Sequence, residues 1–173
     1  MKTLLAIVIL CGLTGCQKAK SPFGPNIEEI QPYQVRALVL GKKNYRMDEL
    51  ASEVPTDLAL GWGPLENPAL AGQLQTGQAN RRFWWLATKG LLKQTTEAEI
   101  IAHTANTHII PANPEIQKAV ASLRPGDKIY LQGSLVNLTL PNGQKIRTSL
   151  SRTDTGDGAC EIFYVRKLTK IPN

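Results

Sequence analysis

The most chemically varied stretch of the sequence is 149–161, which holds hydroxyls, carboxylates, an arginine and a cysteine. As a catalytic centre it would use Cys160 as the nucleophile, a histidine as the base, and Asp154 or Asp157 to orient that base. As a cation site it would offer the oxygens of Asp154, Asp157 and Glu161, although their spacing is not that of a calcium loop. Each function needs a loop that brings these side chains together.

The structural alternative for this stretch is a tight turn stabilised by Asp and Gly, with Arg152 paired to a nearby acid. Cys160 alternates with Ile162 and Tyr164, which predicts that the three side chains share one buried face. A thiol buried among apolar groups is inert, and we favour this interpretation. No catalytic residue is therefore assigned, and the residues that a catalytic centre would use are Cys160, His103, His108 and Asp154.

The two histidines, His103 and His108, raise the question of a zinc site. Their spacing of five puts them about 140° apart on a helix and on opposite faces of a strand. No nearby Cys or Glu completes a ligand set, so only a loop would bring them together. We expect a structural polar loop, in which Asn106 forms hydrogen bonds, and neither a metal nor a cofactor.

Aromatic residues beside arginines form the second candidate site. Trp62 lies between two glycines, where its ring can project from the backbone, and Trp84 and Trp85 follow an arginine pair. Such rings stack on sugars, peptide rings or bases, whereas aromatic residues of a domain without disulfides more often fill its core. In a strand, Trp84 and Trp85 face opposite ways, so one of them is expected in the core. The residues assigned to ligand binding are Trp62, Arg81, Arg82 and Arg152.

The elements that would position these residues are mostly strands. Apolar runs and alternation predict strands over residues 34–40, 81–87, 128–140, 145–154 and 159–168. The clearest helix is 114–123, with Asn113 as its cap and Pro114 at its first position. The last three strands are predicted to form a meander after this helix.

Two glycines mark irregular points in the predicted sheet. The apolar parity changes across Gly133, which predicts a β-bulge there. Asn142 and Gly143 predict a hairpin turn. The fold class is therefore α+β and mostly β, a small antiparallel barrel or sandwich with one main helix, and its bent strands resemble those of OB-like barrels.

The N-terminus reads as a secretory signal, with Lys2 followed by a short apolar run. The run is shorter than the ~20 residues that a membrane-spanning helix needs. It ends in Leu13, Thr14, Gly15 and Cys16, which resemble the lipobox of bacterial lipoproteins. The resemblance implies cleavage before Cys16 and lipid on its thiol and its new amino group. Gln17, in place of Asp, resembles the pattern of sorting to the outer membrane.

Length and composition complete the domain assignment. The 173 residues divide into a signal over 1–15, a lipidated Cys16 with a polar tether to residue 26, and one domain over 27–173. Cys11 leaves with the signal and Cys16 carries lipid, so Cys160 is the remaining thiol and no disulfide forms within the chain. The formal net charge of +6 is modest, and its excess lies in the C-terminal third.

Three further segments, 57–63, 105–112 and 151–161, are similar to signatures of uncharacterised bacterial proteins, a similarity that implies no function. We expect a periplasm-facing protein that is anchored in the outer membrane through Cys16 and acts as a non-catalytic binding or assembly module. Its expected partner is envelope glycan or another envelope protein, and nucleic acid is not expected. Two alternatives remain, a Cys/His hydrolase of envelope polymers or peptides and an OB-like binder of anionic polymers.

Overall fold

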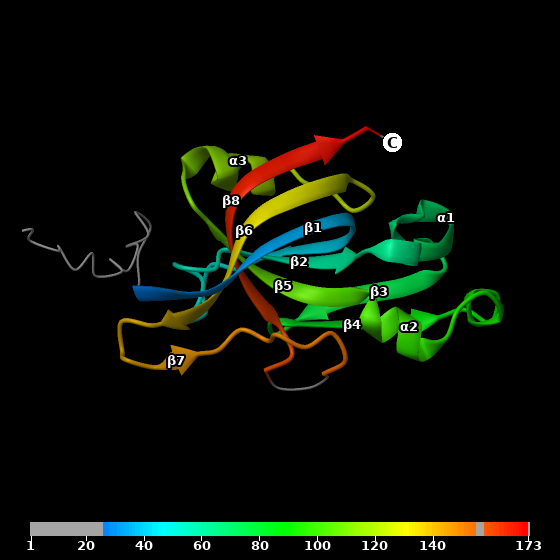
Figure 1. Cartoon of the computed structure of the whole chain (residues 1–173), viewed down its shortest axis with the longest axis horizontal. Coiled ribbons are helices and arrows are strands. Elements are labelled where there is room, and N and C mark those ends of the chain that lie inside the picture. Colours follow the sequence, from blue (N-terminus) through cyan, green and yellow to red (C-terminus); the bar gives the residue numbers. More distant parts are fainter. Residues whose placement is uncertain (1–25, 155–157, 173) are drawn as a thin grey trace, which may run out of the picture.

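A computed structural model describes residues 26–154 and 158–172, and its centre is a closed ring of five strands (Figure 1). β1 pairs with β2 and β6, β2 pairs with β5, and β8 completes the ring between β5 and β6. The β5–β8 pair is parallel and the other four pairs are antiparallel. The ring strands are β1 (Asn26–Asn44), β2 (Thr56–Gly61), β5 (Thr104–Pro111), β6 (Lys128–Thr139) and β8 (Glu161–Ile171).

This strand order, with a helix between the third and fourth ring strands, is the five-stranded Greek-key barrel of the OB fold. The prediction of a mostly β, OB-like barrel with one main helix is therefore confirmed. The helix is α3 (Pro114–Ala121), and Asn113 caps it by accepting a hydrogen bond from the backbone N–H of Ile116. Val120 and Leu123 pack from this helix and its end onto the barrel core.

The barrel core follows from alternation along the strands. Leu58 and Leu60 of β2 point inward, as do Phe163 and Val165 of β8, and all four are buried. The residues between them point outward, and a second apolar cluster covers part of this outer surface. That cluster contains Ile27, Val54, Ile110, Val136, Leu138, Leu140, Ile162 and Tyr164.

A long insertion between β2 and β5 packs on the outside of the barrel, with β4 and α2 beside β5 in the lower half of Figure 1 and α1 at the right-hand end. It forms its own small core from Leu65, Leu74, Leu91 and Ile100. Within the described part of the chain, its strands pair only with each other in a two-stranded sheet. Its elements are η1 (Gly63–Glu66), α1 (Pro68–Ala71), β3 (Leu74–Ala79), β4 (Arg82–Ala87), η2 (Leu91–Lys93) and α2 (Glu97–Ala102).

The register does shift at Gly133, but the extra residue lies in the partner strand. Gln132 of β6 pairs with Lys167 and Gly133 pairs with Val165, so Arg166 of β8 is the bulged residue. A Cβ on Gly133 would lie 1.9 Å from the carbonyl oxygen of Tyr164, so only glycine allows this approach. The apolar parity changes along β6 because Val136 and the residues that alternate with it face the second cluster.

Two sequence predictions about the C-terminal part are wrong. The strand expected over 145–154 is only β7 (Lys145–Ile146), because the chain then leaves the sheet for a loop held by side-chain hydrogen bonds. The expected meander does not form either, since β7 and β8 do not pair with each other: both pair with the edge of β6 opposite β1, β7 at residues 138–139 and β8 at residues 128–135. Asp157 lies outside the described residues.

Candidate functional site

Asp57 is the centre of a polar cluster on the outer side of β2 and β5. Its position next to Leu58 places it outward, and the register of the two strands sets it opposite His108. Asp57 has no exposed surface, yet both carboxylate oxygens have partners. Oδ1 accepts from Nη1 of Arg81 at 2.9 Å and from Nδ1 of His108 at 2.8 Å, and Oδ2 accepts from Nδ2 of Asn106 at 3.1 Å. A buried carboxylate is stable only with such partners.

Arg81 reaches this carboxylate from the turn between β3 and β4. Asn80 and Arg81 have φ of 50° and 63°, the left-handed pair that a two-residue hairpin turn needs. The guanidinium also donates to both oxygens of Asp48 and to the carbonyl of Val54, and lies over the ring of Tyr45 at 3.7 Å. Arg81 therefore fixes the hairpin to the barrel.

His108 lies between Asp57 and Cys160. Because a carboxylate only accepts, Nδ1 carries a hydrogen toward Asp57, and Nε2 is the nitrogen left for another partner. His108 and Cys160 line the same hollow. Burial of the ring lowers the pKa of His108, but the hydrogen bonds and the negative charge of these two partners outweigh it and raise the pKa to about 9. The imidazole is therefore protonated at neutral pH.

Cys160 does not lie on the buried face that the sequence predicts. Ile162 and Tyr164 are buried in the second cluster, whereas Cys160 is half-buried, because β8 begins only at the next residue and the hairpin covers the sulfur only in part. Its Sγ lies 3.8 Å from the carbonyl oxygen of Arg81, which also accepts from Asn106. Cys160 also lines one hollow with His108, and His108 in turn bonds to Asp57. Thiol, imidazole and carboxylate follow in this order at activated thiol nucleophiles.

Cys160 lines two adjoining hollows. The larger is a groove of about 330 Å³ between β4, the start of β5 and the loop before β8. The smaller, of about 150 Å³, also contains His108 and Arg147. The groove is lined by Arg82, Phe83, Trp84, Trp85, Ile101, Thr104, Ala105, Asn106, Ser151, Arg152, Asp154, Ala159, Cys160 and Glu161. The volume lies within the range of about 300–1,000 Å³ typical of ligand pockets.

Glu161 is a second buried acid in the wall of this groove. It is 3% exposed, and its Oε1 accepts from Arg152, while no described residue is a hydrogen-bond partner for Oε2. Burial raises the pKa of Glu161 to about 7, and the nearby Arg152 only partly offsets this. Arg152 also stacks over the rings of Tyr33 and Trp62, so it closes the end of the barrel.

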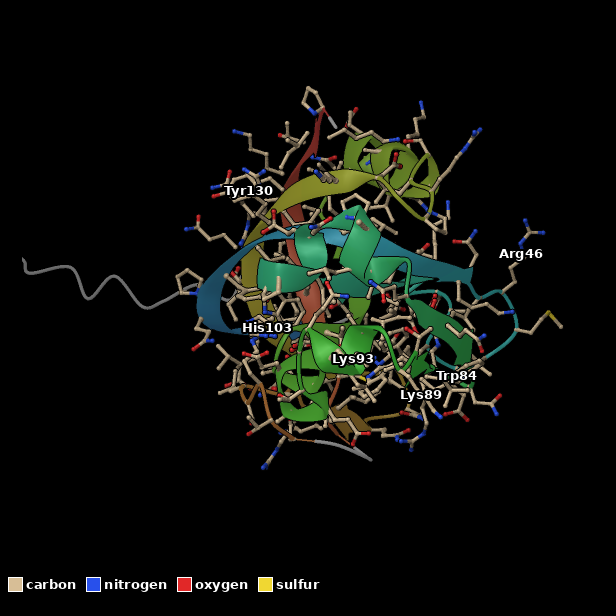
Figure 2. The ribbon with its side chains drawn as sticks, turned by 90° about the vertical axis from the view of Figure 1, so that its right-hand side faces the viewer. Arg46, Trp84, Lys89, Lys93, His103 and Tyr130 are labelled. Carbon is tan, nitrogen blue, oxygen red and sulfur yellow. The ribbon has the colours of Figure 1, made fainter. Side chains whose placement is uncertain are left out.

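The other two candidate catalytic residues have hydrogen-bond partners outside the Asp57 cluster, although Asp154 lines the same groove as Cys160. His103 follows α2 on the face shown in Figure 2, where its Nδ1 is 2.8 Å from the carbonyl oxygen of Glu99 and its ring lies against Gly63. Asp154 accepts from the hydroxyl of Ser149 at 2.6 Å, a bond that shapes the loop before β8. The structure therefore brings together Cys160 and His108, and Asp57 takes the orienting position that the sequence suggested for Asp154 or Asp157.

The residues assigned to ligand binding have different surroundings. Arg82 lines the groove and both Arg81 and Arg152 are held in ion pairs. Trp62 is half-buried against the barrel core, so only part of its ring is available. Trp84 is 52% exposed while Trp85 packs in the core of the insertion, which confirms that the two rings face opposite ways.

Sequence reasoning missed Asp57 as a member of the site. The available signal was its position in an apolar strand, directly before Leu58, because a charged residue in such a strand must have a buried partner. Its partner His108 lies 51 residues away, so no local pattern joins them. Among residues 26–154 and 158–172, no group of three or more His, Cys, Asp or Glu is placed to hold a metal ion.

No helix in the described part of the chain is long and apolar enough to cross a membrane. The chain matches no protein-family model and no curated protein. Among solved structures it is similar to the small single-stranded DNA-binding protein from Streptomyces coelicolor, with a TM-score of 0.36 and 11% identity over 83% of this chain and 94% of that one. The OB fold of this chain is identified from the strand order and connections of its own barrel.

Proposed function

We propose that Cys160, His108 and Asp57 form a nucleophilic cysteine centre that transfers or hydrolyses an acyl group of a peptide or envelope polymer. The observation that carries this proposal is the position of His108, which bonds to a fully buried carboxylate and lines the same hollow as the thiol of Cys160. A nucleophile, a base and a group that orients the base are the parts that such chemistry needs.

The proton transfers follow from the tautomer. Asp57 holds Nδ1–H, and in the reactive form the proton of the Cys160 thiol already lies on Nε2, so the sulfur attacks the carbonyl carbon of the substrate as a thiolate beside the imidazolium. His108 then gives that proton to the leaving nitrogen or oxygen, and a thioester remains on Cys160. Water, deprotonated by the same nitrogen, releases the acid and restores the thiol.

A purely structural role accounts less well for Cys160. Arg81 and Asn106 already satisfy Asp57, so the cysteine is not needed to complete the buried network. The sulfur is also only half-buried, so it adds little apolar packing. A thiol that meets a charged imidazole at an open groove is the environment of reactive cysteines.

The proposal is tested by alkylation of the full chain with iodoacetamide at pH 6, followed by mass spectrometry of the peptide that contains Cys160. An ordinary thiol is almost wholly protonated at this pH, so glutathione is the reference. We expect Cys160 to react at least about tenfold faster than glutathione, and His108→Gln to remove this advantage. His103→Gln, a histidine outside the cluster, is the matched control and should have no effect.

An ordinary rate at Cys160, unchanged by His108→Gln, would exclude the nucleophilic centre. The groove, with aromatic and arginine side chains in its walls, would then favour the second candidate, a non-catalytic OB-like binding module. The lipobox at Cys16 supports the same location for both candidates, a lipid-anchored protein of the cell envelope that faces the periplasm.

A further inference from the structure

The edge of β4 that faces away from β3 lacks a strand partner among the described residues. In a hairpin with a two-residue turn, the residues flanking the turn, here Ala79 and Arg82, exchange their backbone hydrogen bonds. Alternate pairs along the ladder do the same, so Trp84 bonds to Gly77. The N–H and C=O groups of Phe83 and Trp85 therefore point away from β3.

These free backbone groups face the groove. Four consecutive residues of β4, 82 to 85, line it, although neighbouring side chains in a strand point to opposite faces. The wall must therefore include the backbone edge itself. The carbonyl of Arg81, on the same side of the chain as those of Phe83 and Trp85, accepts from Asn106 and lies 3.8 Å from the Cys160 sulfur. The edge thus runs up to the nucleophile.

An open strand edge is normally protected by a partner, a bulge or charged side chains, because it invites another strand. Here two of the three exposed residues of β4 are large and apolar, with Trp84 52% exposed and Leu86 61% exposed, and Arg82 is the third. Figure 2 shows Trp84 at the surface. The Trp84 ring lies over Gly77, its partner in β3, where a Cβ would lie 2.3 Å from a ring carbon.

We propose that an extended polypeptide segment binds in this groove as a third strand, paired with the backbone of Phe83 and Trp85. Backbone pairing recognises any extended chain, and groove side chains select among sequences. Glu161 supplies a further contact for a polar group of the peptide, because Oε2 is buried in the wall with no partner in the described part of the chain. This inference rests on the proposed function. The pairing places a carbonyl of the bound peptide at Cys160, where the sulfur attacks it.

The binding step is tested without the chemistry, in the full chain carrying Cys160→Ala. The probe is acetyl-Ala-Thr-Val-amide, and the control is the same peptide with its two internal amide nitrogens methylated, which removes the N–H groups needed for strand pairing. We expect the probe to shift the amide resonances of Phe83 and Trp85 in ¹⁵N–¹H NMR spectra, and the methylated peptide to bind at least about tenfold more weakly. Equal binding of the two peptides, or shifts confined to other residues, would overturn the proposal.

The reactive step is tested with the corresponding tripeptide vinyl sulfone, in which the Cys160 sulfur adds to the alkene carbon β to the sulfonyl group and a proton adds to the α carbon. Phe83→Pro removes one N–H from the free edge without touching the ladder to β3, and Phe83→Ala controls for the lost ring. We expect the labelling rate to fall at least about tenfold in Phe83→Pro relative to Phe83→Ala, with melting temperatures reported for both.

The outcomes separate the two proposals. Fast iodoacetamide labelling that depends on His108, with no effect of N-methylation or of Phe83→Pro, would support the nucleophilic cysteine centre and contradict the binding of a peptide as a third strand. Slow labelling by both reagents, together with selective binding of the unmethylated peptide to Cys160→Ala, would contradict the nucleophilic cysteine centre and support the binding of a peptide as a third strand. A dimer in sedimentation equilibrium that disappears in Phe83→Pro would mean that a second copy occupies the edge, and would also overturn the proposal.

Discussion

At the scale of single residues, the cluster places two positive groups and a half-buried thiol around one buried carboxylate. Asp57 can hold both Arg81 and a protonated His108 because its two oxygens offer about four acceptor sites. The cost of desolvating Asp57 is offset by hydrogen bonds in fixed positions, and the removal of any one partner leaves a charge uncompensated. The cluster should therefore respond strongly to pH and to substitution.

The first prediction concerns the pH dependence given by His108. Its pKa is about 9 in the folded chain and near 6.5 when unfolded, so folding is favoured by the bound proton. This stabilisation is fully present below about pH 6.5 and is lost as the pH rises through 9. We expect the melting temperature of the wild type to fall over this window and that of His108→Gln to fall less. Parallel curves for the two proteins in thermal scans from pH 6 to 9.5 would contradict the assignment.

The second prediction concerns Glu161, which affects stability over a lower pH range than His108. Its pKa is about 7 in the folded chain against an ordinary value of 4.5, so the folded state also binds this proton more tightly. The contribution is present below about pH 4.5 and is lost as the pH rises through 7. Glu161→Gln cannot ionise, so its melting temperature should change less between pH 4.5 and 7. The exposed Glu49→Gln is the control and should follow the wild type.

At the scale of elements, the β3–β4 hairpin forms one wall of the groove, and it is held mainly through its turn. The contacts that join it to the barrel are polar: Arg81 with Asp57 and Asp48, Gln78 with Asn106, and Thr76 with the carbonyl of Leu40. The hairpin covers the outward residues of β2, all of which are buried. Loss of its attachment would therefore expose the cluster and open the groove.

The third prediction follows for Arg81. Arg81→Ala leaves the Asp57 carboxylate with one charged partner fewer, which typically costs about 3–5 kcal/mol. Arg81→Lys should rescue little of this loss, because a single ammonium cannot bond to Asp57, Asp48 and Val54 at once. Urea unfolding gives the free energies, and amide exchange should show the hairpin losing protection before the barrel strands. A loss below about 1 kcal/mol would mean that the apolar core of the insertion holds the hairpin by itself.

At the scale of the whole molecule, an OB barrel is combined with an insertion that covers part of the barrel surface. In OB folds the face of the second and third strands commonly binds oligonucleotides or oligosaccharides. Here the outward residues of those strands, β2 and β5, hold the Asp57 cluster beneath the hairpin. The groove accordingly lies between the insertion and the loop that leads into β8.

The fourth prediction concerns the location of the molecule. If residues 13–16 act as a lipobox, Cys16→Ser prevents lipid attachment, and the protein should appear in the soluble or unprocessed fraction instead of the membrane. Fractionation with metabolic labelling by a palmitate analogue measures this, and Cys160→Ser is the matched control that should stay membrane-bound. Continued processing, acylation and membrane binding of Cys16→Ser would exclude the anchor.

The sequence by itself determined the fold class and many of its elements. Alternation and turn residues are local properties of a strand or helix, so the helix capped by Asn113, the strand with Trp84 and Trp85, and an irregularity at Gly133 could all be predicted. Only the tertiary structure decided where the bulged residue lies, because register depends on both strands and Arg166 carries no signal of its own. The site was decided in the same way. Asp57, Arg81, His108 and Cys160 come from two barrel strands, a hairpin turn and a loop, and no sequence spacing relates them. They meet because barrel closure sets β2, β5 and β8 side by side and a left-handed turn directs Arg81 onto them.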